Sequence, residues 1–167
     1  IKHIISSALT SGNDKNIGHE YNKDIETRFR EDARTTIATP WNKINELLQG
    51  GLGNGDFGLI FGSPGGGKSW SLVALGGYAV RMGYNVIHYT LELGEAYVGR
   101  RYDAFFSKVP VDQILQNREK IEDILPQLQG ELIIKEFPPG RATMSTIESH
   151  IAKVGDSGLK PDLIIID

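Results

Sequence analysis

A continuous run of residues near the middle of the chain has the types and spacing of a phosphate-binding loop. It follows the pattern G-x-x-x-x-G-K-S and consists of Gly62, Ser63, Pro64, Gly65, Gly66, Gly67, Lys68 and Ser69. Glycines let successive backbone N–H groups turn inward and cradle phosphate oxygens. The lysine of this pattern reaches the β- and γ-phosphates, and the serine hydroxyl ligates Mg²⁺. The sequence therefore predicts a nucleotide site in which Lys68 also assists catalysis and Ser69 holds the metal.

Two flanking elements must hold this loop in place. The apolar run 57–61 leads into it and is typical of a buried strand. The stretch from Ser69 to Met82 leads out of it and has the pattern of a helix, whose N-terminus would add unpaired N–H donors and a partial positive charge. Trp70 follows the loop directly, so we assign it to the nucleotide site, although its helical position is more typical of a core residue.

Two acidic residues end apolar runs elsewhere in the chain. Asp167 follows the run 163–166, which is the pattern of a Walker B aspartate that holds Mg²⁺ beside the loop serine. Glu92 ends the run 86–91, and nucleotide hydrolysis needs a group that orients and deprotonates water. The alternative role for Glu92 is an N-terminal cap or first-turn acid of the next helix, and Glu95 is the better candidate for the capping role. Because parallel strands end at one edge of a sheet, both acids can converge on the loop.

The remaining pattern alternates apolar strands with helical stretches. Strands are expected over 86–91, 132–134 and 163–167, and helices over 95–107, 111–129 and 145–154. The last of these helices begins with a capping-box pattern, Ser145-x-x-Glu148. This alternation predicts an α/β fold with a mostly parallel sheet and helices on both faces.

The ends of the chain differ in character from its centre. Residues 1–39 are polar and mixed in charge, which predicts a linker. Within it, an apolar Ile25–Phe29 pair would suit a docking helix, and a solvated linker helix is equally consistent with the pattern. Residues 40–167 are expected to form one domain. The chain begins without methionine and stops just after an apolar run, so we expect a fragment truncated on both sides.

Composition excludes several classes of protein. The chain has no cysteine, so it forms neither disulfides nor thiolate metal sites, and its 4 histidines show no ligand spacing. Its net charge of −3 argues against a protein that wraps nucleic acid with its whole surface. No apolar run reaches membrane-spanning length and no secretory signal is visible, so we expect a cytoplasmic protein without a membrane partner.

Several further segments carry a resemblance to a known family. They are 39–45 with Gly50-Gly51-Leu52, 83–93, Arg101-Tyr102-Asp103, 131–138 and 161–167. These segments are similar to the RecA-like ATPase domain of DnaB-family replicative helicases, and most of all to those of T-even-type phages. The resemblance covers 40–167 well and the first 39 residues loosely. It implies a RecA-like P-loop ATPase core that is truncated here after the Walker B strand.

The resemblance also implies an activity and partners. It indicates an ATP- and Mg²⁺-dependent motor that couples ATP hydrolysis to translocation on single-stranded DNA and to duplex unwinding. Glu92 falls at the family's catalytic glutamate, and Arg101 falls where the family places an arginine, whose guanidinium could stack on adenine. The family further implies a homo-hexamer in the host cytoplasm, contact with primase and other replisome proteins, and DNA-binding loops and an arginine finger beyond Asp167.

Other functions are still open on the sequence alone. A RecA-type recombinase shares the placement of Glu92 and differs in catalysing strand exchange. A regulatory nucleotide switch would bind ATP and turn it over slowly, without stimulation by single-stranded DNA. A small-molecule kinase fits least well, because no acceptor-binding lid is recognisable.

Overall fold

The computed structural model describes residues 20–23, 25–29 and 35–167. The chain divides into two units, 1–34 and 35–167, and each is described by itself. The described part of the first unit contains one short helix, α2 (Ile25–Arg28); Ile25 in this helix and Phe29 just after it have exposed side chains. The rest of the expected linker helix lies partly outside the described residues, so its role as a docking helix stays a prediction.

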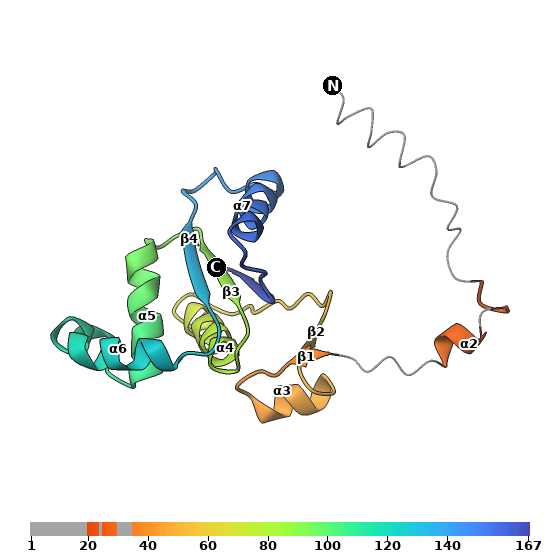
Figure 1. Cartoon of the computed structure of the whole chain (residues 1–167), viewed down its shortest axis with the longest axis horizontal. Helices are drawn as coiled ribbons and strands as arrows, with labels where there is room; N and C mark the ends of the chain where they lie inside the picture. The colour runs from red at the N-terminus through yellow and green to blue at the C-terminus, as the bar shows by residue number, and fades with distance from the viewer. Residues whose placement is uncertain (1–19, 24, 30–34) are drawn as a thin grey trace, which may run out of the picture. The chain divides into compact units, whose positions relative to one another are not determined.

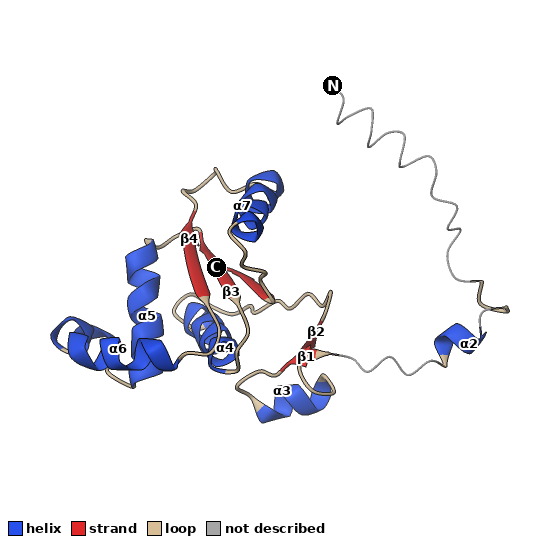
Figure 2. Ribbon diagram, in the orientation of Figure 1, coloured by secondary structure: helices blue, strands red, loops and turns tan. Residues whose placement is uncertain are grey.

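The centre of the second unit is a parallel three-stranded sheet with the order β4-β3-β5. β3 (Val86–Thr90) lies in the middle and is buried along its whole length, as expected for a strand covered on both faces. β4 (Leu132–Glu136) and β5 (Leu163–Ile166) pair with it on either side. Figure 2 shows the three strands side by side, which confirms the predicted α/β fold with a parallel sheet.

Helices cover both faces of this sheet, as the alternating pattern predicts. α4 (Lys68–Arg81) and α5 (Glu95–Ser107) pack on one face, and α7 (Met144–Asp156) packs on the other (Figure 1). The α4–α5 side contains the larger core, made of Val73, Ala79, Val80, Val86, Val98, Tyr102, Phe106 and Ile165. The α7 side contains a smaller one, made of Ile87, Tyr89, Ile147 and Val154.

The other elements connect or flank this framework. They are β1 (Thr36–Ile37), α3 (Asn42–Leu47), β2 (Leu52–Gly53), η1 (Val111–Gln116), α6 (Arg118–Ile124) and η2 (Leu125–Gln127), and β1 pairs antiparallel with β2. The single helix expected over 111–129 is thus divided, because the Asn117 side chain bonds to the Gln113 carbonyl and Pro126 lacks an N–H group. Within the described ranges, no helix has the length and apolar character needed to cross a membrane.

The predicted strand over 57–61 is wrong. These residues form no strand, and Phe57 and Phe61 are 89% and 86% exposed. A strand needs a neighbour to complete its backbone hydrogen bonds, and in the part of the chain that the structure describes no segment pairs with this one. Apolar composition alone therefore did not decide the structure of this segment.

The predicted capping box of the last helix is also wrong, by two residues. Thr143 is the N-cap of α7, and its hydroxyl accepts a hydrogen bond from Thr146 N at 3.2 Å. In return, the Thr146 hydroxyl accepts one from Thr143 N at 2.8 Å. The extended backbone of Thr143 is typical of an N-cap residue, so the helix begins at Met144 and Ser145 and Glu148 lie inside it.

Candidate nucleotide-binding site

The glycine-rich loop has a backbone that only glycine adopts easily. Gly65 and Gly67 have φ angles of 75° and 83°, in the left-handed region. Neither has a heavy atom within 4 Å of the point where a Cβ atom would lie. Gly67 is also the N-cap of α4 and provides no side-chain cap, so the first N–H groups of that helix have no side-chain acceptor there. The loop therefore offers open backbone donors at the start of a helix.

The Lys68 side chain folds back over this loop. Its ammonium group donates to the carbonyl oxygens of Gly62 at 3.1 Å and Ser63 at 3.0 Å. Both acceptors are neutral, so the positive charge of Lys68 is not cancelled by these contacts. An anion in the loop would meet this charge at close range.

Ser69 and Asp167 lie together although 98 positions separate them in the sequence. Ser69 Oγ, on the first turn of α4, donates to Asp167 Oδ1 at 3.1 Å. The backbone of Asp167 extends the sheet, because its N–H donates to Tyr89 O at 2.9 Å and its carbonyl accepts from Leu91 N at 2.9 Å. The structure therefore brings together the two residues that the sequence assigns to the metal.

Glu92 lies in the turn 91–94, between the end of β3 and the start of α5. Its neighbour Leu91 bonds to Asp167, so Glu92 is at the same edge of the sheet as Ser69 and Asp167. Its side chain is exposed, and it has no hydrogen bond or ion pair to any other described residue. Its carboxylate is therefore open to solvent at this edge of the sheet.

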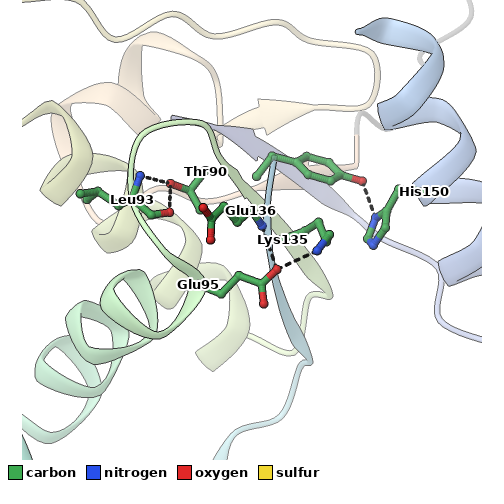
Figure 3. A network of polar contacts seen from close by, with 7 residues as sticks. Thr90, Leu93, Glu95, Lys135, Glu136 and His150 are labelled. Atoms are coloured by element: carbon green, nitrogen blue, oxygen red, sulfur yellow. Dashed lines mark hydrogen bonds and ion pairs between the residues drawn. The ribbon is translucent and has the colours of Figure 1, made fainter. Parts of the chain in front are cut away.

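Two side chains that the sequence did not assign to the site hold the turn of Glu92. Thr90 Oγ1 accepts from Leu93 N at 3.1 Å and donates to Leu93 O at 2.9 Å. Glu95 Oε1 accepts from Lys135 Nζ at 2.8 Å and from Glu136 N at 3.0 Å (Figure 3). The hydrogen bond from Lys135, followed by that from the Glu136 backbone, lowers the pKa of the Glu95 carboxyl.

These contacts correct one expectation for Glu95. Its charge does lie in the first turn of α5, where an acid is favourable, but it makes no capping hydrogen bond to the helix. Its carboxylate bonds to β4 instead. The signal that could have found this contact is the position of Lys135 and Glu136 at the carboxyl end of a predicted neighbouring strand.

Arg101 lies between two aromatic rings next to the loop. Its guanidinium carbon is 5.4 Å from the centre of the Trp70 ring and 5.3 Å from that of Tyr97. Trp70 is 45% exposed, so it is not a core residue and the alternative reading of its helical position is wrong. The two residues that the sequence assigns to nucleotide binding outside the loop, Trp70 and Arg101, therefore contact each other.

A buried His–Tyr pair links β3 to α5 under this surface. His88 Nδ1 and the Tyr102 hydroxyl are 2.8 Å apart, and His88 Nε2 has no partner among the described residues. Burial lowers the pKa of His88 to about 4, although Asp167 acts in the opposite direction. Burial likewise raises the pKa of Tyr102. Both side chains are therefore neutral near pH 7, and sequence analysis gave no signal for this pair.

Comparison with known proteins bears on the family resemblance. No protein-family profile matches this chain. The chain is similar to a curated protein described as a DnaB-like replicative helicase, from Enterobacteria phage T4, with 25% identity over an alignment that covers 100% of this chain. The chain spans 38% of the length of that relative. The predicted resemblance to DnaB-like replicative helicases is therefore confirmed by this comparison.

Proposed function

We propose that this chain is the ATP-binding and ATP-hydrolysing part of a DNA helicase with a RecA-like P-loop core. The hydrogen bond from Ser69 Oγ to Asp167 Oδ1 carries the proposal. It places the loop serine beside the aspartate at the end of β5, and these two residues would bind one Mg²⁺ together. The similarity of the whole chain to a DnaB-like replicative helicase supports the same function.

The residues at this site fit a magnesium ion and a nucleoside triphosphate. A hydroxyl and a carboxylate are the hard oxygen donors that Mg²⁺ takes, and here they are 3.1 Å apart. The open space at Gly65 and Gly67 allows phosphate oxygens to approach the loop backbone closely. When bound, Mg²⁺ would neutralise the charge that develops on the transferred phosphoryl group.

Each residue of the chain then has a defined role. Lys68 exchanges its two carbonyl acceptors for phosphate oxygens, which bind an ammonium group more strongly because they are charged. Glu92 orients the attacking water and accepts its proton. Trp70 and Arg101 provide a flat, partly exposed surface on which the base can stack.

The activity of the whole protein follows from this site only with additional partners. We propose translocation on single-stranded DNA and duplex unwinding by a homo-hexamer that also contacts primase and other replisome proteins. The net charge of −3 leaves no excess of lysine and arginine, so we assign the DNA contacts to residues outside this chain. The exposed Ile25 and Phe29 side chains suit docking of α2 on a neighbouring subunit.

Replacement of Glu92 tests the hydrolytic role. Glu92→Gln keeps the size of the side chain and removes the base, so we expect retained ATP binding and a turnover reduced by about 10² or more. Steady-state ATPase assays of the protein that carries this chain measure the change. The matched control is Glu148→Gln, an exposed glutamate on α7, which should turn over ATP normally. Near-normal turnover of Glu92→Gln would place the base elsewhere.

A further inference from the structure

We propose that Glu95 is a positioning residue that holds the turn of Glu92 in place by linking it to β4. The inference rests on the proposed function, because it assumes that Glu92 is the base. It concerns a residue that touches neither nucleotide nor water in the mechanism above, and that acts only through the backbone of the turn 91–94.

The beginning of this turn is held by the sheet. Leu91 N donates to Asp167 O at 2.9 Å, which ties the turn to the end of β5. The Thr90 hydroxyl bonds to both N and O of Leu93, which closes the turn on itself. The first half of the turn is therefore fixed relative to the proposed metal ligand.

The end of the turn depends on Glu95. Its Oε1 atom accepts from Glu136 N at 3.0 Å and from Lys135 Nζ at 2.8 Å, so one oxygen joins the first turn of α5 to the end of β4 (Figure 3). Glu136 lies opposite Thr90 in the β3–β4 register. Among the described residues, no other side-chain hydrogen bond joins the first turn of α5 to β4. Both ends of the turn are thus fastened to the same sheet.

Glu92 needs such support because its own side chain is exposed and unpaired within the described residues. Its position is set by the backbone on which it stands. Misplacement of a catalytic group by about 1 Å can reduce a rate by about 10². Loss of the Glu95 contact frees the end of the turn and should lower kcat, while the loop that binds the phosphates is untouched and KM should change little.

The two partners of Glu95 can be separated by substitution. Glu95→Ala removes both hydrogen bonds, whereas Glu95→Gln keeps an oxygen that can accept from Glu136 N and loses only the charge paired with Lys135. Lys135→Met removes the ion pair alone. We therefore expect Glu95→Ala to lower kcat by about tenfold or more, and the other two variants to retain most of the activity, because exposed ion pairs contribute little.

A double-mutant cycle with Glu92→Gln tests the proposal in the protein that carries this chain. If Glu95 acts through Glu92, Glu95→Ala lowers kcat by about tenfold in the parent and has almost no further effect in Glu92→Gln. An equal loss in both backgrounds would show a general structural role and overturn the inference. Near-normal turnover of Glu92→Gln itself would instead refute the proposed function, so the two failures are distinguishable.

Two controls keep the result interpretable. Glu122→Ala removes a comparable exposed glutamate from the Arg118–Glu122 ion pair, on a different helix, and should leave kcat unchanged. If Glu95→Ala fails to fold, Glu95→Leu, which also removes the acceptor oxygen, takes its place in the same cycle. A kcat of Glu95→Leu equal to that of the parent would then overturn the positioning role.

Discussion

Adjacent residues of β3 form the same kind of pair on opposite faces of the sheet. His88 bonds to Tyr102 of α5 at 2.8 Å, and Tyr89 bonds to His150 of α7 at 2.9 Å. In the first pair, both side chains are buried. In the second pair, Tyr89 is buried and His150 is only half-buried.

The difference follows from what each face must hold. The α4–α5 face carries the loop, Ser69 and Arg101, so its helices have to keep a fixed distance from the sheet. Gly76 of α4 shows how closely these elements pack, because a Cβ atom there would lie 2.9 Å from Ile165 Cδ1 of β5 and 2.4 Å from the Tyr102 hydroxyl of α5. In α7, a Cβ atom on Gly155 would meet nothing within 4 Å. We expect the α4–α5 face to tolerate substitutions much less than the α7 face.

The largest expected difference is in the dependence of stability on pH. The pKa of His88 falls from 6.5 to about 4 on burial, with Arg101 adding to the decrease and Asp167 opposing it. Above pH 6.5, His88 is neutral in both the folded and the unfolded protein, so its full contribution to the free energy of unfolding is present. As pH falls toward 4, only the unfolded chain takes up the proton, and the free energy of unfolding should fall by about 3 kcal/mol.

Urea denaturation between pH 7 and pH 4.5 measures this effect. His88→Gln should flatten the profile, and His150→Gln should change it less because His150 is only partly buried. A parent profile that is flat over this range would show that His88 is not buried in its neutral form.

Substitution of one glycine on each face should have opposite effects. Gly76→Ala forces a methyl group against the Tyr102 hydroxyl and, at 2.9 Å, against Ile165 Cδ1. We expect it to lower the free energy of unfolding by about 2 kcal/mol, a typical cost of overpacking. Gly155→Ala lies in a helix with open space and should raise it by about 0.5 kcal/mol. Thermal unfolding of the two variants measures both changes in stability. Equal changes for Gly76→Ala and Gly155→Ala would contradict the expected difference between the two faces.

The smallest expected difference between the two faces is in the stability lost when the hydroxyl group of Tyr102 or of Tyr89 is removed. Tyr102→Phe leaves His88 Nδ1 buried without a partner and should cost about 1.5 kcal/mol. Tyr89→Phe should cost less than about 1 kcal/mol, because His150 can bond to water. Urea denaturation at pH 7.5 separates the two values. A larger loss of the free energy of unfolding for Tyr89→Phe than for Tyr102→Phe would contradict the expectation that the α4–α5 face is the more sensitive one.

Sequence patterns predicted the parts of this molecule that depend on local residues. The helices over 69–82 and 95–107 and the three parallel strands were all predicted, since apolar periodicity and turn residues specify them directly. The pairing of Ser69 with Asp167 was predicted from topology, because both were expected at one edge of a parallel sheet.

Two errors are local, namely the capping box of α7 and the division of the helix expected over 111–129, and the others concern features that depend on neighbours distant in sequence. The run 57–61 has the composition of a strand but no partner among the described residues. The carboxylate of Glu95 bonds to β4 rather than capping its own helix, and the His88–Tyr102 pair needs the gap at Gly76. Local periodicity does not specify such contacts, because they are set by packing between elements; for Glu95 the only signal is the order of the predicted strands.

Calorimetric titration of ATP with Mg²⁺ tests the central claim most directly. Lys68→Ala removes the charge at the loop and should weaken binding about 10- to 100-fold, since a hydrogen bond to a charged group contributes about 1.5 to 3 kcal/mol. Lys43→Ala, which alters an exposed lysine on α3, should bind like the parent. The account predicts this contrast, and equal ATP affinity of the two variants would contradict the assignment of the loop as the nucleotide site.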